Sequence, residues 1–170
     1  MTSLKNFIHD YLDFPKSGIL FKDISSVLRY PSVFADLIKD ISAWDLYEKC
    51  DSIIAIDARG FIFGSAISMH LSKPLILARK PGKLPGEILE KSYQLEYGNN
   101  SLAIQKKAIE GFDNFIIVDD LLATGGTVSC VADILSSVNK KILGLSVVIE
   151  LQELNGKDKF DFPVDSQIVF

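Results

Sequence analysis

Cysteine and histidine are scarce in this chain, which carries two of each among its 170 residues. The cysteines, Cys50 and Cys130, lie far apart and form no CxxC pair, a spacing that argues against a disulfide framework or a redox motif. The histidines, His9 and His70, are isolated too, so the chain lacks the ligand spacing of a zinc site. We therefore expect two reduced, buried thiols and no zinc.

Long hydrophobic runs and an excess of positive charge are also missing. The most apolar stretch, residues 53–78, is interrupted by charged side chains and a histidine, whereas a membrane span needs roughly 18 apolar residues. The N-terminal residues lack the apolar region of a secretory signal. With 18 Lys and Arg against 22 Asp and Glu, the net charge of −4 argues against non-specific nucleic-acid binding. We expect a cytoplasmic protein with no membrane or nucleic-acid partner.

The length suits a single domain over residues 1–170. Short β-branched apolar runs alternate with helical stretches, which is typical of an α/β fold with right-handed crossovers. The predicted strands cover residues 52–57, 75–78, 115–118 and 145–149. The spacing of apolar residues predicts helices over 3–13, from 31 to about 41, over 60–72 and over 127–138. The polar, turn-rich segment between Lys80 and Lys107 is typical of a functional lid or excursion.

The most informative segment runs from Val118 to Thr127 and reads VDDLLATGGT. A predicted buried strand leads into two adjacent acids, Asp119 and Asp120, and a glycine-rich turn then opens a helix. Ligands bind at the ends of parallel strands in α/β proteins, and the N–H groups of a helix N-terminus form an anion site. We predict that the acids contact sugar hydroxyls or a metal-bound water. The predicted phosphate loop consists of Ala123, Thr124, Gly125, Gly126 and Thr127.

Other interpretations of this segment are less specific. The structural alternative is a strand–turn–helix junction in which the acids and threonines only cap the helix. A Walker A loop is excluded because no lysine follows the glycines at the required place. A dinucleotide fingerprint is excluded because GxGxxG is absent.

Residues 118–127 resemble the phosphoribosyl pyrophosphate (PRPP) motif of type I phosphoribosyltransferases. The resemblance implies that the loop 123–127 holds the 5-phosphate of PRPP and that Asp119 and Asp120 bind the ribose hydroxyls. It also implies a mostly parallel central sheet flanked by helices, a small N-terminal hood over residues 1–30 and a flexible catalytic loop over 81–98.

Three further segments resemble the adenine phosphoribosyltransferases, one branch of that family. Residues 14–24 (FPKSGILFKDI) resemble the purine-binding segment and residues 57–61 (DARGF) the pyrophosphate loop. Residues 79–86 (RKPGKLPG) and 95–98 (LEYG) resemble the flexible catalytic loop. The resemblance implies transfer of the phosphoribosyl group of PRPP to adenine, which gives AMP and pyrophosphate in purine salvage. It also implies Mg²⁺ as cofactor and a homodimer.

Several cations lie in the segments that would meet the pyrophosphate. Arg59 follows Asp57 and Ala58 at the end of a predicted strand, and its planar fork suits phosphate oxygens. The alternative for Arg59 is a surface arginine beside a helix start, and the alternative for Arg79, Lys80 and Lys83 is a solvated run of charge. In the family the peptide before this arginine is often strained or cis, which corresponds here to the Asp57–Ala58 bond. Besides the acids and the phosphate loop, the residues that we assign to PRPP are Asp57, Ala58, Arg59, Arg79, Lys80, Lys83 and Tyr97.

On the base side, the resemblance assigns Glu96 to the purine and its proton, and Tyr97 to a lid over the sugar. Glu96 could instead be an exposed acid on a mobile strand, and Tyr97 could simply pack. Phe21 could stack on the purine or belong to the core. Lys22 stands where family members often carry arginine, which leaves its role open. The predicted adenine-binding residues are Ile19, Leu20, Phe21, Lys22 and Glu96.

The resemblance makes Glu96, Arg59 and Lys83 the expected catalytic residues. Mg²⁺ would be bound mainly through PRPP and water, with Asp119 and Asp120 as candidate ligands. Two alternatives remain: a transferase for a 6-oxopurine or orotate, and a non-catalytic regulator that senses PRPP or purines. The regulator is disfavoured because the acidic chain has no residues to spare for a DNA-binding module.

Overall fold

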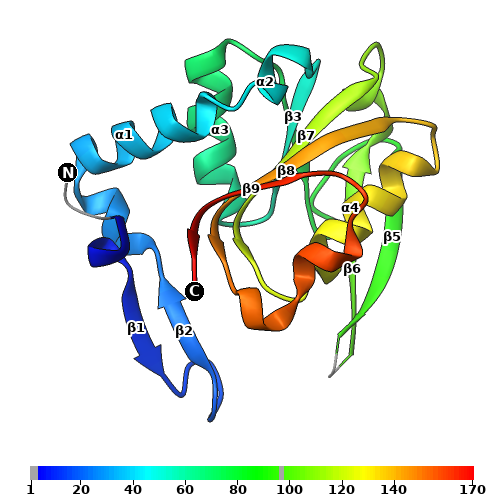
Figure 1. Cartoon of the computed structure of the whole chain (residues 1–170). Helices are drawn as coiled ribbons and strands as arrows, with labels where there is room; N and C mark the ends of the chain where they lie inside the picture. Colours follow the sequence, from blue (N-terminus) through cyan, green and yellow to red (C-terminus); the bar gives the residue numbers. More distant parts are fainter. Residues whose placement is uncertain (1–3, 96–97) are drawn as a thin grey trace.

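The centre of the molecule is a parallel sheet of five strands in the order β4-β3-β7-β8-β9 (Figure 1). The computed structural model describes residues 4–95 and 98–170. It confirms the predicted α/β class and all four predicted strands, and it adds β9. The strands are β3 (Ser52–Ile56), β4 (Leu75–Ala78), β7 (Asn114–Leu122), β8 (Lys141–Glu150) and β9 (Val164–Val169).

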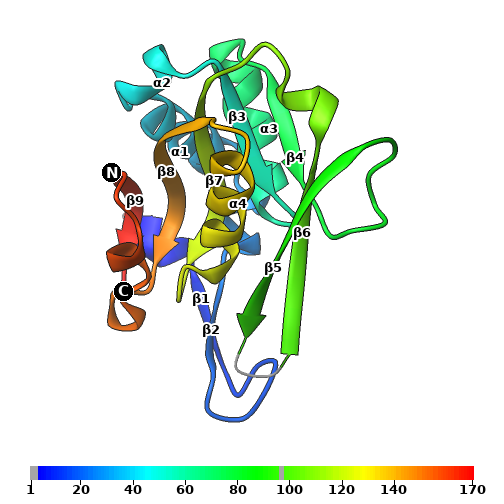
Figure 2. The ribbon, with the colours of Figure 1, turned by 90° about the vertical axis from the view of Figure 1, so that its right-hand side faces the viewer.

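Both faces of the sheet are buried because successive strand residues point into two different hydrophobic cores. On one face Ile53 and Ile116 pack with α1 (Pro31–Ser42) and α3 (Gly60–Leu71), and α2 (Leu46–Lys49) lies at the edge of the same core. On the other face Ile54 and Ile117 pack with α4 (Gly126–Ser136). Figure 1 shows α3 and α4 on opposite sides of β7, and in Figure 2 α4 lies in front of β7. The three longer helices confirm the predictions, with ends shifted by one or two residues.

The N-terminal segment is a hairpin, and the helix predicted over residues 3–13 was wrong. A single 3₁₀ turn, η1 (Leu4–Phe7), precedes β1 (His9–Leu12), which pairs antiparallel with β2 (Leu20–Asp23). A second 3₁₀ helix, η2 (Ser25–Arg29), follows. Helical periodicity in a short segment carries no information about a pairing partner 8 to 14 residues away, and here that pairing overrides local preference.

The segment between β4 and β7 contains a second hairpin that the polar pattern did not predict. Strand β5 (Ile88–Leu95) pairs antiparallel with β6 (Gly98–Gln105). Only the first part of the predicted loop over 81–98 is therefore irregular; most of the rest is strand. On β6, Leu102 and Ile104 are buried in the core on the α4 side, which attaches the base of this hairpin to the body.

Short 3₁₀ helices complete the connections of the described chain. They are η3 (Lys106–Ile109), η4 (Gln152–Leu154) and η5 (Gly156–Lys159). No helix within residues 4–95 and 98–170 has both the length and the apolar character needed to cross a bilayer.

Candidate active site

Three neighbouring strands of the sheet deliver charged side chains to one edge. The residue pairing sets Ile56 beside Ala78 and Ala55 beside Val118, so β3, β4 and β7 reach this edge together. Asp57 and Arg79 follow the ends of β3 and β4 directly, and the N–H of Asp57 donates to the carbonyl of Ala78 over 2.9 Å. The carboxyl edge of a parallel sheet is the usual ligand edge of an α/β fold.

The two acids of the motif lie inside β7 rather than after it. Asp119 is 9% exposed and Asp120 is 6% exposed. The N–H of Asp120 donates to Asp119 Oδ1 over 2.9 Å. Burial, with the charge of Asp120 beside it, raises the pKa of Asp119 well above its usual value. Burial also raises the pKa of Asp120, although the cation of Arg59 opposes that rise. A buried acid pair of this kind is a functional-site signal.

Arg59 connects the acid pair to the hood. Its Nε lies 2.7 Å from Asp120 Oδ2, and its guanidinium lies 5.1 Å from the centre of the Phe21 ring. Although buried, Asp120 Oδ2 accepts no hydrogen bond of ordinary geometry from the part of the chain that the structure describes. The ion pair thus leaves this oxygen with capacity for a further hydroxyl, water or cation.

A second arginine lies one strand away. Arg79 Nε donates to Asp57 Oδ2 over 3.0 Å, and its guanidinium lies 5.6 Å from the Phe61 ring centre. Its Nη1 also donates to the carbonyl of Lys83 over 3.4 Å, while the side chains of Lys80 and Lys83 are exposed. The structure therefore gathers the predicted cations near one edge. The Asp57–Ala58 peptide is cis, as the resemblance suggested.

The predicted phosphate loop forms a small hollow at the start of α4. Gly125 adopts a left-handed backbone with φ of 79°, which brings the chain from β7 into the helix at Gly126. The N–H groups at this helix N-terminus form an anion-binding arrangement. The hollow has a volume of about 150 Å³ and is lined by Asp119 and by residues 121–128. Its size and its backbone suit one phosphate group.

Two glycines outside the phosphate loop determine how closely the site packs. Gly156, in η5, lies so close behind the loop that a Cβ on it would collide with the carbonyl of Ala123. A Cβ on Gly60 would lie 2.8 Å from Asp119 Oδ1. Gly60 belongs to the DARGF segment. Gly156 lies more than twenty residues beyond the phosphate loop in sequence, so only the folded chain reveals the role of Gly156.

The predicted adenine-binding residues lie on the hood hairpin. Phe21 is half-buried, packs edge-on against Phe14 with 5.0 Å between ring centres and faces Arg59, so it lies outside both main cores. Ile19 and Leu20 are 43% and 46% exposed, and Lys22 pairs with Asp10 over 2.8 Å. Glu96 and Tyr97 lie outside the described residues, so their roles stay predictions.

Comparison with known proteins gives this fold and site a class. The family model described as "Phosphoribosyl transferase domain" matches residues 24–168, which contain the acid pair, the loop at α4 and all of the central sheet except the last residue of β9. The chain is thus a phosphoribosyltransferase by domain.

Closer relatives define the branch. An adenine phosphoribosyltransferase from Prochlorococcus marinus (strain MIT 9211) is 58% identical over 167 residues, which cover 98% of this chain and 97% of the relative. The adenine phosphoribosyltransferase structure from Thermoanaerobacter pseudethanolicus superposes with a TM-score of 0.92 at 41% identity and 98% coverage of both chains. That from Saccharomyces cerevisiae, complexed with an imino-altritol bisphosphate and adenine, gives a TM-score of 0.90 at 37% identity, with 97% and 96% coverage. The chain belongs to the adenine phosphoribosyltransferase family.

Proposed function

We propose that this chain transfers the phosphoribosyl group of PRPP to N9 of adenine and thereby forms AMP and pyrophosphate in purine salvage. The observation that carries the proposal is the convergence of a buried acid pair, a phosphate-sized loop and two arginines at one edge of the sheet. These groups match the sugar, the 5-phosphate and the pyrophosphate of PRPP in chemical character. Family membership supports adenine as the base.

In this proposal the loop holds the 5-phosphate. The N–H groups of residues 124–127 donate to its oxygens at the positive end of α4. Asp119 and Asp120 accept hydrogen bonds from the ribose hydroxyls, and Asp120 Oδ2 has free capacity for one. The sugar is then fixed between the phosphate loop and the acids, and its C1′ atom points along the edge toward Arg59.

The pyrophosphate lies among the cations. Arg59 and Arg79 offer planar forks that suit phosphate oxygens, and the exposed ammonium groups of Lys80 and Lys83 add charge. Because both arginines are paired with acids here, PRPP binding has to share or replace those pairs. Charge around the leaving group lowers the barrier as the C1′–O bond breaks.

The residues fit a magnesium ion that is bound chiefly through substrate. Mg²⁺ prefers oxygen ligands, and the acid pair supplies carboxylate oxygens, one of them without a hydrogen bond of ordinary geometry among the described residues. Within residues 4–95 and 98–170 no group of three or more His, Cys, Asp or Glu side chains could form a metal cage. The remaining ligands would therefore come from PRPP and water. The bound ion would neutralise charge on the pyrophosphate.

On the base side, Phe21 is the platform on which the purine stacks, with Ile19 and Leu20 in the same segment. The Lys22 side chain points to the other side of the strand, toward Asp10 and Phe170, so Lys22 contributes to the base site through its backbone. As the C1′–O bond breaks, N9 of adenine forms the new bond to C1′ and loses its proton. Glu96 takes part in that proton transfer, and closure of the segment 81–98, with Tyr97 over the sugar, excludes water from the cationic C1′. We further propose a homodimer in the cytoplasm.

The release of pyrophosphate separates this proposal from a regulator that only senses PRPP. The protein is mixed with PRPP, Mg²⁺ and adenine, and pyrophosphate is followed in a coupled assay, with Lys140→Ala as a matched control at a surface ion pair far from the site. We expect multiple turnovers in the wild type and in the control. Tight PRPP binding without pyrophosphate release would refute the enzyme and favour the regulator.

A further inference from the structure

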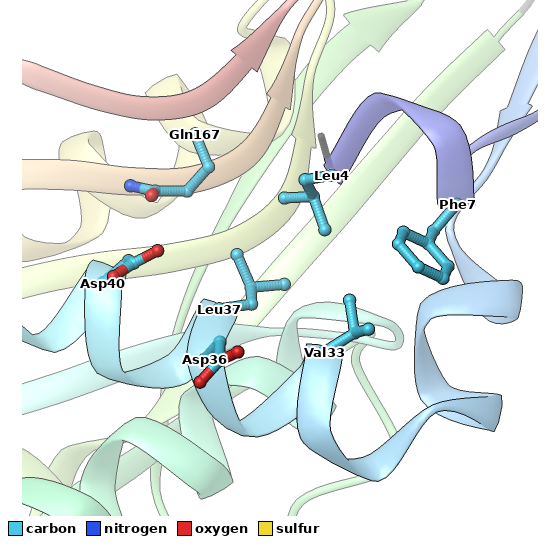
Figure 3. A pocket seen from close by; sticks show the side chains of 7 residues that line it. All are labelled: Leu4, Phe7, Val33, Asp36, Leu37, Asp40 and Gln167. Carbon is cyan, nitrogen blue, oxygen red and sulfur yellow. The ribbon is translucent and has the colours of Figure 1, made fainter. Parts of the chain in front are cut away.

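The hood is attached to the body around η1 and η2, where Leu4, Phe7, Ile24 and Val27 pack in the core beside α1, whereas its β1–β2 hairpin projects beyond them (Figure 1). Its hairpin exposes large apolar side chains: Tyr11, Leu12 and Phe14 are 52%, 72% and 53% exposed. A cavity of about 330 Å³ separates η1 from α1 and β9 (Figure 3). Figure 3 shows Leu4 and Phe7 of η1 facing Val33, Leu37 and Gln167 across this space. Beyond these attachments, the placement of the hairpin depends on the contacts that its own side chains make with the body.

One such contact joins β2 to the residue that follows β9. The ammonium of Lys22 lies 4.1 Å from the centre of the Phe170 ring, and the Lys22 side chain is only 10% exposed. It also pairs with Asp10 of β1 over 2.8 Å. A cation held this close to a ring face and shielded from water makes a strong cation–π contact.

The Phe170 ring is itself firmly placed. The N–H of Phe170 donates to the carbonyl of Glu150 over 2.9 Å, and its own carbonyl accepts from the N–H of Gln152 over 2.9 Å. Lys5 of η1 lies 5.1 Å from the ring centre and donates to the carbonyl of Val169 over 3.0 Å. The ring is thus fixed by the backbone of the sheet, while its π face contacts cations from two elements of the hood.

This contact bears directly on the purine site because Lys22 and Phe21 are neighbours on one strand. Successive strand residues point to opposite sides, so fixing Lys22 against Phe170 also fixes the side from which Phe21 faces Arg59. We infer that Phe170 is a positioning residue for the purine site: its ring holds Lys22, and through β2 it holds the Phe21 platform over Arg59. The inference rests on the proposed function and adds a determinant of adenine binding that lies outside the four recognised segments.

The test is steady-state kinetics of Phe170→Ala. Alanine keeps both backbone hydrogen bonds of residue 170 and removes only the ring. We expect the KM for adenine to rise about tenfold, because a shielded cation–π contact is lost, while the KM for PRPP and kcat change less than twofold. Phe170→Trp keeps a π face and is expected to restore the wild-type KM. Phe170→Leu keeps an apolar group without a π face and is expected to behave like alanine.

Phe112→Ala is the matched control, since Phe112 is also a partly buried phenylalanine. It precedes β7 and therefore lies at the amino end of the parallel strands, whereas Phe170 lies at their carboxyl end. It is expected to lower Tm without changing the KM for adenine. An unchanged KM in Phe170→Ala, or equal rescue by leucine and tryptophan, would overturn the inference while leaving the proposed function intact. An equal rise in the KM for PRPP would also overturn it, because the effect would then be general loosening. A wild-type protein that forms no AMP would refute the proposed function and the inference together.

Discussion

Replacing Gly125 by alanine tests whether the loop at the start of α4 is shaped to hold a phosphate. Gly125 and Gly111 have nearly the same left-handed backbone, with φ of 79° and 80°. Their surroundings differ: a Cβ on Gly111 would meet nothing within 4 Å, whereas a Cβ on Gly125 would lie 2.8 Å from the carbonyl oxygen of Gly156 and 3.0 Å from the ring of Phe160. Gly111→Ala is therefore a matched control for the backbone cost alone.

The expected magnitudes follow from these contacts. An alanine in the left-handed region costs about 1–2 kcal/mol, which lowers Tm by about 3–6 °C in a chain of this size. Gly111→Ala should lose only that amount. Gly125→Ala should lose about 1–3 kcal/mol more, because the loop must move away from the backbone of η5. Displaced N–H groups weaken bonds to a charged phosphate that are each worth about 1.5–3 kcal/mol, so the KM for PRPP should rise about 10- to 100-fold.

Thermal unfolding and kinetics of the two variants give the answer. We expect Gly111→Ala to keep the wild-type KM for PRPP and Gly125→Ala to raise it while the KM for adenine changes little. If both variants lost the same stability and kept the same KM for PRPP, the close approach of Gly156 would play no part in phosphate binding. The assignment of the loop would then be refuted.

Three further substitutions address the charges. Asp119→Asn keeps an acceptor for the N–H of Asp120 but removes a carboxyl whose pKa burial raises, so that the folded state binds its proton more tightly than the unfolded chain does. The stability of the wild type should therefore fall as the pH rises from the ordinary pKa of an aspartate through the raised pKa of Asp119. The variant should have a higher Tm than the wild type at pH 7, lose this advantage near pH 3 and turn over slowly. A difference in Tm that stays the same across that pH range would contradict a raised pKa for Asp119. Arg59→Ala removes the partner of Asp120 and should lower kcat/KM for PRPP by about 10- to 100-fold in initial-rate assays. Glu96→Gln should lower kcat by about 10²-fold without loss of PRPP binding by calorimetry; wild-type turnover in both Arg59→Ala and Glu96→Gln would defeat the catalytic assignment.

Local sequence patterns were sufficient for the central sheet and its helices. Continuous β-branched runs such as Ile53–Ile56 are buried on both faces, and the apolar spacing after Pro31 matches a helix that packs on them. The same patterns could not predict β9, whose polar residues Asp165 and Gln167 break any apolar run at the sheet edge. They also predicted a helix over residues 3–13, because neither segment alone indicates that β1 pairs with β2.

In the candidate site, too, some residues could be predicted from the sequence and some contacts could not. Asp119, Asp120 and the glycine loop were predictable because they are consecutive and carry their own chemistry. The contact of Gly156 with the loop and the contact of Phe170 with Lys22 were not, because each joins residues more than thirty positions apart. Ion pairs such as Arg59–Asp120 were predictable as neighbours in space only once the ends of β3 and β7 were placed side by side.

The most direct test of the central claim is nucleotide formation with each base in turn. The protein is supplied with PRPP, Mg²⁺ and either adenine, guanine, hypoxanthine or orotate, and the products are separated by chromatography. We expect AMP from adenine and no nucleotide from the other three bases. Product from guanine, hypoxanthine or orotate, with none from adenine, would contradict it, because the hood would then select a different base.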